Sequence, residues 1–195
     1  MSRLVLVRHA EPEESARGRC YGSLDVGLSP AGRAQARRLA TELSGLGCDA
    51  VYTSPRRRAV DTAAPIAALC GLTAMPEERL REIDFGEIEG CTYDEIAASR
   101  PELYAAWMSA PTTVRFPGGE SYADLRERAV AACEEIRRRF SCVLVVTHGG
   151  VIRAVVAELL AMPADVIFRL DQSYGGVTIV DWIEDVPLVR VLNRS

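Results

Sequence analysis

The chain has 195 residues, of which 48% are hydrophobic and 26% charged, and this length and composition suit one domain with a full core. Its net charge of −4 argues against a nucleic-acid partner. All 23 basic residues are arginine, so a mechanism that uses a lysine as a Schiff base or as a phosphate ligand is excluded. The six cysteines form no CxxC pair, and the apolar start is too short for a signal peptide. No apolar run nears the roughly 20 residues of a membrane span. We therefore expect a cytoplasmic protein with no membrane partner.

Two short apolar runs and two Ser-Pro pairs organise the first third of the chain. Leu4–Val7 is a continuous apolar run, typical of a strand that is buried on both faces, and Ala50–Thr53 is a second short strand. The first Ser-Pro pair predicts a helix from Ser29 to about Leu46, because serine suits the N-cap and proline the first helical position. The second pair predicts in the same way that Ser54 caps a helix reaching about Cys70.

A less regular region follows. Thr92 and Glu95 have the spacing of a capping box, and Pro101–Met108 has the composition of a short helix. The next stretch, Ala110–Ser121, is rich in proline and glycine and is expected to be a long loop. Loops of this length in compact domains are often functional lids, so we expect residues 91–121 to form a lid-like insertion.

The last part of the chain again alternates helices and strands. Ser121 should cap an amphipathic helix that reaches about Arg139, and a short helix should follow Pro163. We also expect a strand over Cys142–Thr147, a helix over Gly150–Ala161, and two final strands near Val177–Trp182 and Leu188–Leu192. This alternation predicts an α/β fold, a three-layer αβα sandwich with a mainly parallel central sheet. No linker is visible, so residues 1–195 are expected to be a single domain.

The only two histidines of the chain follow two of these strands. His9 comes directly after Arg8 at the end of the first strand, and His148 follows the strand that ends at Thr147. Open α/β sheets bind ligands beyond the carboxyl ends of their strands. Transfer of a phosphoryl group needs a nucleophile, cations and an acid, and His9 beside Arg8 suits the first two roles. His148 could then orient the phosphate, and Gly149 would let backbone N–H groups approach it closely.

Two further segments carry charge that this chemistry could use. The cluster Arg56–Arg58 lies in the first helical turn, where cations oppose the helix dipole unless an anion binds there. A solvated surface cluster is the alternative for these arginines. The segment Leu80–Gly90 offers four candidates for the acid, and the residues alone do not choose among Glu82, Asp84, Glu87 and Glu89. A working acid needs burial or a charged neighbour to raise its pKa from about 4.3.

Together these motifs resemble the histidine phosphatase superfamily, whose fold is phosphoglycerate-mutase-like. The motifs RHA, SPxxRA, LxExxFGxxEG, PGGES and THGG follow one another along nearly the whole chain. The resemblance implies that His9 becomes phosphorylated and that Glu82 is the proton donor. It also implies that Arg8, Arg58 and His148 hold the phosphoryl group, with Arg58 chosen because it directly precedes Ala59.

The chain departs from the family pattern in its first loop. The family usually has glycine where Ala10 stands, a hydroxyl residue where Pro12 stands, and asparagine where Ser15 stands. The stretch Gly18–Val26 resembles the corresponding loop of α-ribazole phosphatases. The resemblance therefore extends the candidate phosphate- or substrate-binding residues to the set Arg8, Ser15, Tyr21, Gly22, Arg58, Glu82, His148 and Gly149.

The predicted function is hydrolysis of a small-molecule phosphate ester through a phosphohistidine, without a metal or another cofactor. Two histidines without HxH or HExxH spacing argue against a zinc or two-metal hydrolase. α-Ribazole 5′-phosphate is one candidate substrate. The alternatives are a broad-specificity or sugar-phosphate phosphatase, a phosphoglycerate mutase-like enzyme, a phosphatase of protein phosphohistidine, and a non-catalytic scaffold of the same fold. Mutases of this family are generally longer, so the chain length favours hydrolysis.

Four large side chains of the expected lid have two interpretations. They could face a bound organic group, or they could pack the lid onto the domain, and the residues concerned are Tyr104, Trp107, Met108 and Phe116. The sequence leaves both interpretations open, and it also leaves a homodimer open.

Overall fold

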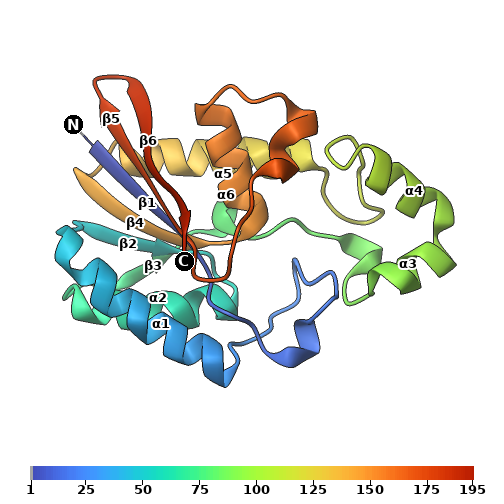
Figure 1. Cartoon of the computed structure of the whole chain (residues 1–195), viewed down its shortest axis with the longest axis horizontal. Coiled ribbons are helices and arrows are strands. Elements are labelled where there is room, and N and C mark those ends of the chain that lie inside the picture. The colour runs from blue at the N-terminus through green and yellow to red at the C-terminus, as the bar shows by residue number, and fades with distance from the viewer. Residues whose placement is uncertain (1) are drawn as a thin grey trace.

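The computed structural model describes residues 2–195, and a six-stranded sheet forms its centre (Figure 1). Its strands are β1 (Ser2–Arg8), β2 (Ala50–Thr53), β3 (Ala74–Pro76), β4 (Cys142–Thr147), β5 (Val177–Ile183) and β6 (Val186–Arg194). The strand order is β3-β2-β4-β1-β5-β6. The first four are parallel to one another, whereas β5 and β6 are antiparallel to their neighbours. This confirms the mainly parallel sheet that the sequence predicts.

Helices cover both faces of the sheet, which confirms the three-layer sandwich. In Figure 1, α1 (Pro30–Leu43) and α2 (Arg57–Leu69) lie on one face, and α5 (Tyr122–Arg137) and α6 (Gly149–Leu159) lie on the other. Alternate residues of β1 enter the two resulting cores, since Leu4 packs on the α5–α6 side and Val5 on the α1–α2 side. A strand with both faces buried needs the continuous apolar run that the sequence shows.

Side-chain caps begin most of the helices where the sequence predicts them. The Ser29 hydroxyl accepts a hydrogen bond of 2.9 Å from the Gly32 amide, and Thr92 and Ser121 each form a capping box. The prediction that Ser54 caps α2 is wrong. That helix begins at Arg57 with Arg56 at its N-cap and no side-chain cap, and the Ser54 hydroxyl instead lies 2.7 Å from Nε2 of His148 in a distant segment.

Two helices stand beside the sandwich (Figure 1). They are α3 (Tyr93–Ser99) and α4 (Pro101–Ser109), and with the following loop they enclose a small core around Trp107 and Phe116. The loop is held against the segment that carries the acidic candidates, because Gly86 has a φ of +56° and a Cβ there would lie 2.2 Å from the Pro117 carbonyl. The helices, the loop and that segment therefore form one packed unit.

Five short 3-10 helices complete the structure, and the sequence predicts only the last of them as a separate helix. They are η1 (Glu14–Ala16), η2 (Ser44–Leu46), η3 (Glu78–Leu80), η4 (Gly86–Ile88) and η5 (Ala164–Arg169). Within residues 2–195 no helix has the length and apolar character needed to cross a membrane.

Candidate active site

The two histidines meet at the carboxyl ends of two adjacent parallel strands. Arg8 is paired with Thr147 in the register of β1 and β4, so the residues that follow, His9 and His148, leave the sheet side by side. Their ring centroids are 5.2 Å apart, and the two side chains are 2% and 0% exposed. The fold thus brings together the two strand-end histidines that the sequence singles out.

The ring of His9 has a defined tautomer. Its Nδ1 lies 2.8 Å from the carbonyl oxygen of Ala10, which can only accept a hydrogen bond, so in the neutral ring Nδ1 carries the proton and Nε2 does not. The Ala10 amide donates to Thr62 Oγ1 at 3.0 Å, which holds this backbone segment in place. Burial, with the positive charges of Arg58 and Arg8, lowers the pKa of His9 well below its usual value of 6.5. At neutral pH His9 therefore presents an unprotonated Nε2.

The ring of His148 is oriented by Ser54. The Ser54 hydroxyl accepts a hydrogen bond from the Arg56 amide at 3.3 Å and lies 2.7 Å from His148 Nε2, so its own proton can be donated to that nitrogen. In the neutral ring the proton of His148 is then on Nδ1, a buried atom with no hydrogen-bond partner within residues 2–195. Burial and the charge of Arg58 also lower the pKa of His148 well below 6.5. The ring thus offers a neutral N–H donor beside His9.

The structure separates Arg58 from the other arginines of its cluster. Arg58 is 0% exposed and donates hydrogen bonds from Nη1 to the Leu24 carbonyl at 2.8 Å and from Nη2 to the Gly22 carbonyl at 2.9 Å. Its Cζ lies 5.0 Å from the centroid of the Tyr21 ring. Arg57, in contrast, has an exposed side chain near Asp61. Of the three arginines in the cluster Arg56–Arg58, only Arg58 is among the charges that lower the pKa of His9.

Arg8 is held by the segment before β5, which carried no recognised motif. Its Cζ lies 4.1 Å above the Tyr174 ring, and its Nη1 donates to the Gln172 carbonyl. The Tyr174 hydroxyl lies 2.8 Å from the Tyr21 hydroxyl, so the two tyrosines link the supports of Arg8 and Arg58. Sequence reasoning missed both Tyr174 and Gln172, because nothing local relates them to a strand end more than 160 residues earlier.

Glu82 is the acidic candidate that lines the same cavity as His9. Its two carboxylate oxygens accept hydrogen bonds from the Gly150 amide at 3.1 Å and the Ile83 amide at 3.0 Å. A Cβ at Gly150 would lie 2.3 Å from Glu82 Oε1, so glycine is required for this approach. The other three carboxylates have partners elsewhere, as Asp84 binds the Gly86 amide, Glu87 pairs with Arg100, and Glu89 binds the Ser23 and Phe85 amides.

A cavity of about 160 Å³ opens above His9. Its lining consists of Arg8, His9, Arg19, Cys20, Tyr21, Gly22, Glu82, Phe85 and Tyr93. The predicted residues Tyr21, Gly22 and Glu82 therefore share one space with His9. Gly149 lies at its edge, since a Cβ there would be 3.5 Å from Arg8 Nε. Ser15 is not brought to this space, because η1 carries it to an exposed position after the chain turns at Pro12.

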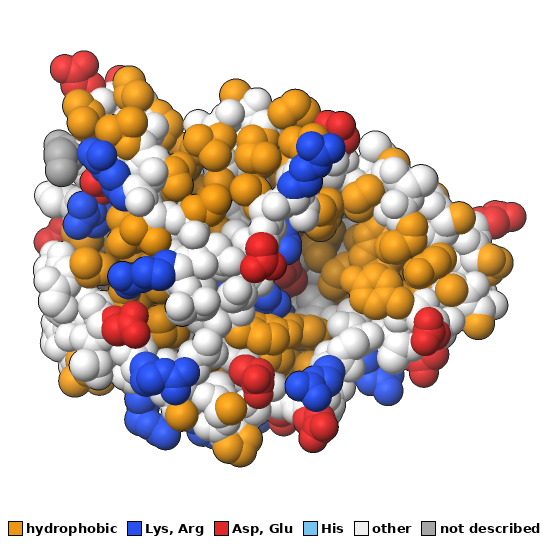
Figure 2. Space-filling view, viewed as in Figure 1, with side chains coloured by type: hydrophobic (Ala, Val, Ile, Leu, Met, Phe, Trp, Pro, Cys, Tyr) orange, Lys and Arg blue, Asp and Glu red, His pale blue; other side chains and the backbone are white. Residues whose placement is uncertain are grey.

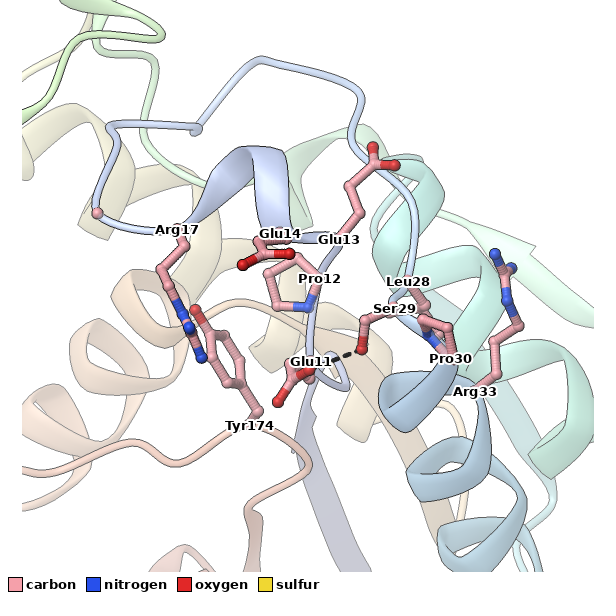
Figure 3. A pocket seen from close by; sticks show the side chains of 11 residues that line it. Glu11, Pro12, Glu13, Glu14, Arg17, Leu28, Ser29, Pro30, Arg33 and Tyr174 are labelled. Atoms are coloured by element: carbon pink, nitrogen blue, oxygen red, sulfur yellow. Dashed lines mark hydrogen bonds between the residues drawn. The ribbon is translucent and has the colours of Figure 1, made fainter.

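A larger hollow on the other side of Tyr174 has a different character (Figure 3). Three carboxylates line it, from Glu11, Glu13 and Glu14, and Glu11 accepts a hydrogen bond of 2.7 Å from the Ser29 hydroxyl. Neither histidine lines it. Arg17 and Arg33 also line it, so three carboxylates outnumber two guanidinium groups and the lining has no excess of positive charge to bind a phosphate group.

The four large side chains of residues 91–121 divide into two pairs. Trp107 and Phe116 are 8% and 2% exposed, and they pack in the core around α3 and α4 while also lining a second cavity. Tyr104 packs against the same core, and Met108 is exposed; neither lines that second cavity. Packing of the unit is therefore confirmed for Trp107 and Phe116, which also line a cavity, and contact with a bound organic group stays a prediction for them.

Comparisons with known sequences and structures identify the family of this chain and several of its relatives. A sequence model of the histidine phosphatase superfamily (branch 1) matches residues 4–195. Phosphoserine phosphatase 1 of Hydrogenobacter thermophilus is 40% identical over 195 residues, which cover 99% of this chain and 92% of that protein. The metal-independent phosphoserine phosphatase of Arabidopsis thaliana is 34% identical over 200 residues, covering 95% of this chain and 82% of that protein. The crystal structure of the α-ribazole phosphatase from Shigella flexneri matches with a TM-score of 0.89 at 27% identity, covering 98% of this chain and 96% of that one.

Proposed function

The chain belongs to branch 1 of the histidine phosphatase superfamily, and we propose that it hydrolyses the phosphate ester of a small organic molecule through a phosphohistidine on His9. Its relatives include phosphoserine phosphatases, and like them it is a phosphoric monoester hydrolase. The observation that carries the proposed mechanism is the unprotonated Nε2 of His9, which shares a cavity with the carboxyl group of Glu82.

In the first step, Nε2 of His9 attacks the phosphorus atom and the bond from phosphorus to the ester oxygen breaks. The departing alkoxide takes a proton from Glu82, so the products of this step are a free alcohol, phosphohistidine and an ionised Glu82. The proton on Nδ1 of His9 stays hydrogen-bonded to the Ala10 carbonyl, which supports the positive charge that the ring gains on attack.

Three groups stabilise the negative charge of the phosphoryl oxygens. Arg8 and Arg58 supply fixed positive charge, and each has a buried Nε without a hydrogen-bond partner among residues 2–195. His148 supplies its Nδ1–H. These donors are already oriented by Gln172, Gly22, Leu24 and Ser54, so little reorganisation is needed when the charge develops.

In the second step, water attacks the phosphorus atom of phosphohistidine. Glu82, now ionised, takes a proton from this water, the bond from phosphorus to Nε2 breaks, and inorganic phosphate leaves. Glu82 and His9 thereby return to their starting states. The arginine charges take the place of a divalent metal ion in both steps, and the metal-independent relative supports this reading.

Two candidate substrates differ in the organic group that the phosphate ester carries. α-Ribazole 5′-phosphate is supported by the likeness of the fold and of the loop Gly18–Val26 to an α-ribazole phosphatase. Phosphoserine is supported by the 40% identity to a phosphoserine phosphatase. We propose that α3, α4 and the loop up to Ser121 form the lid that decides between such groups, because three of its aromatic rings, those of Tyr93, Trp107 and Phe116, line a cavity that adjoins the one above His9.

The test measures phosphate release in EDTA from these two esters, 3-phosphoglycerate, sugar phosphates and nucleotides, with His9→Ala as the blank. We expect release that EDTA does not abolish, and a preference of 100-fold or more for one ester would identify the substrate. Wild-type rates equal to the blank for every ester would favour a scaffold and overturn the proposal. Loss of activity in EDTA that added metal restores would overturn its metal-independent part.

The covalent intermediate has a test of its own. Rapid acid-free quenching with a ³²P-labelled ester should trap label on the protein, and that label should be acid-labile and alkali-stable, as a phosphoramidate is. Glu82→Gln should slow formation of the labelled protein for esters with a poor leaving group. Label that survives acid, or that persists in His9→Ala, would contradict attack by His9.

A further inference from the structure

A second cavity of about 190 Å³ adjoins the one above His9. Its lining is mostly aromatic and aliphatic, with two charged side chains, and comprises Glu82, Ile83, Phe85, Tyr93, Trp107, Pro111, Phe116, Tyr122, Leu125, Gly150, Arg153, Ile167 and Phe168. It shares Glu82, Phe85 and Tyr93 with the first cavity. Figure 2 shows the molecule hollowed between the sandwich and the α3–α4 unit, with hydrophobic side chains on both sides of the hollow.

The place of this cavity relative to Glu82 decides what can enter it. In the proposed function the proton of Glu82 goes to the oxygen that leaves with the organic group. A cavity that continues from Glu82 away from His9 therefore receives the leaving group, whereas the first cavity receives the phosphoryl group. Its volume suits a small molecule, since pockets for drug-sized ligands begin at about 300 Å³.

Among residues 2–195, Arg153 is the only one whose cationic side chain lines this second cavity. It projects from α6, donates one hydrogen bond from Nε to the Leu170 carbonyl at 2.8 Å, and lies with Cζ 5.7 Å from the Phe168 ring centroid. Within residues 2–195 its guanidinium forms no ion pair, and its two Nη atoms form no hydrogen bond with the protein. A largely buried cation without a carboxylate partner is costly, and such groups mark functional sites more often than structural ones.

The guanidinium of Arg153 faces the reaction centre. A Cβ at Gly149 would lie 3.2 Å from Arg153 Nη1 and 3.5 Å from Arg8 Nε, so both arginines approach the same point over the start of α6. Burial lowers the pKa of Arg153, and the charge of Glu82 is the largest of the effects that raise it. Arg153 thus stands between the phosphoryl site and the apolar leaving-group cavity.

We propose that Arg153 binds a carboxylate of the leaving group, so that the preferred substrates are phosphate esters of short hydroxy acids. This rests on the proposed function, because it needs the leaving group to occupy the second cavity. A carboxylate would accept paired hydrogen bonds from the two free Nη atoms, and the apolar lining would strengthen this ion pair by excluding water. The positive charge also offsets the repulsion that an ionised Glu82 would exert on an anionic group.

The test compares two esters that differ mainly in this carboxylate, 3-phosphoglycerate and glycerol 3-phosphate. We expect wild-type kcat/KM to favour 3-phosphoglycerate by at least 30-fold, and Arg153→Gln to lose 30-fold or more on that ester but less than 3-fold on glycerol 3-phosphate. Arg153→Lys, which keeps the charge, should retain part of the preference. Arg37→Gln on the exposed face of α1 is the matched control and should change neither ester.

Each contrary result has its own meaning. Hydrolysis of neither ester nor of p-nitrophenyl phosphate by the wild type would defeat the proposed function itself. Equal losses on both esters in Arg153→Gln would show that Arg153 acts on the phosphoryl group or on folding, and would overturn the carboxylate site alone. A measurement on the wild type is independent of any variant: D-glycerate should inhibit hydrolysis of p-nitrophenyl phosphate at a concentration at least tenfold below that of glycerol. Equal inhibition by the two would also overturn the site.

Discussion

At the scale of single residues, backbone groups and small residues shape the site as much as charged side chains do. The Ala10 carbonyl selects the tautomer of His9, and the Gly150 amide holds the carboxylate of Glu82. The replacement of the family's usual glycine by Ala10 leaves this interaction intact, since a carbonyl is common to every residue. At Gly150, however, the absent side chain is itself what the site needs.

Gly150→Ala should therefore impair the acid. The added Cβ would lie 2.3 Å from Glu82 Oε1 and would displace the carboxylate from its place in the cavity that it shares with His9. We expect kcat to fall at least tenfold, while the free energy of unfolding is not lowered by helix propensity, since alanine suits a helix better than glycine by about 1 kcal/mol. Gly45→Ala is the control, because a Cβ at Gly45 meets no atom within 4 Å. An unchanged kcat in Gly150→Ala would contradict the position assigned to Glu82.

The two buried histidines should make stability depend on pH. Their pKa values lie well below 6.5 in the folded chain, so between the folded value and 6.5 the unfolded chain binds more protons. Stability is then fully present above pH 6.5 and is lost as the pH falls toward the folded pKa, by up to about 1.4 kcal/mol per pH unit for each histidine.

Urea unfolding between pH 7.5 and 5.5 measures this loss. His148→Gln should lower the slope of unfolding free energy against pH by about half relative to the wild type. His9→Gln should do the same, which separates the histidines from carboxylates that titrate at lower pH. A wild-type stability that stays constant over this range would contradict the neutral state of both rings.

At the scale of elements, the α3–α4 unit has a core of its own, built largely from aromatic rings. The rings of Trp107, Phe85 and Phe116 all contact one another, with Trp107 5.7 Å from Phe85 and 5.1 Å from Phe116 and the two phenylalanines 5.0 Å apart. Trp107 also stacks on Tyr93 at 5.3 Å. Phe85 and Tyr93 also line both cavities. The packing of the unit and the shape of the substrate space therefore depend on the same rings.

Trp107→Ala should affect both the stability of the α3–α4 unit and the binding of substrate. Loss of the Trp107 ring should lower the free energy of unfolding by about 3–5 kcal/mol if this core unfolds together with the sandwich. Backbone amides of residues 93–121 should then exchange faster with solvent. We expect KM to rise more for esters with a large organic group than for p-nitrophenyl phosphate. Met108→Ala is the control, since Met108 is 47% exposed and lines neither cavity beside Glu82. Unaltered kcat/KM for every ester in Trp107→Ala would leave the ring a packing role only.

At the scale of the whole molecule, the question is whether the sandwich and the α3–α4 unit unfold together. The two tryptophans of the chain report on the two parts separately, because Trp182 is buried on β5 and Trp107 lies in α4. We propose that residues 1–195 form one cooperative domain, since the loop after α4 packs closely on Gly86 and Glu82 links that segment to α6.

Single-tryptophan variants test this. Fluorescence of Trp182→Phe and of Trp107→Phe should give the same midpoint in urea as far-UV circular dichroism of each variant. An earlier midpoint for the fluorescence of Trp107 would instead show that the α3–α4 unit opens on its own. Circular dichroism of each variant controls for stability changes caused by the substitution itself.

Local patterns were sufficient for most of the elements. The run Leu4–Val7 and the segment Cys142–Thr147 gave strands with nearly these bounds, since a strand covered on both faces must be apolar throughout. Strand β3 was missed because it has three residues, ends in proline and pairs only along one edge. Ser54 was misassigned because its hydroxyl has two suitable partners, a helix start nearby and His148 across the sheet, and the sequence displays only the first.

The sequence by itself determined the fold class and the two strand-end histidines, because periodicity and motif order are properties of neighbouring residues. The residues alone left four acidic candidates beside one another, and the family resemblance pointed to Glu82. The tertiary structure places Glu82 in one cavity with His9, while the other three bind nearby backbone or arginine. The sequence also left Ser15 as a phosphate contact, which the turn of the first loop carries away from the cavity. Tyr174 and Arg153 were not singled out from the sequence, and only the tertiary structure places them near His9 and Glu82. Their roles depend on distances between residues far apart in the chain, and those distances are set by how the layers pack rather than by any local pattern.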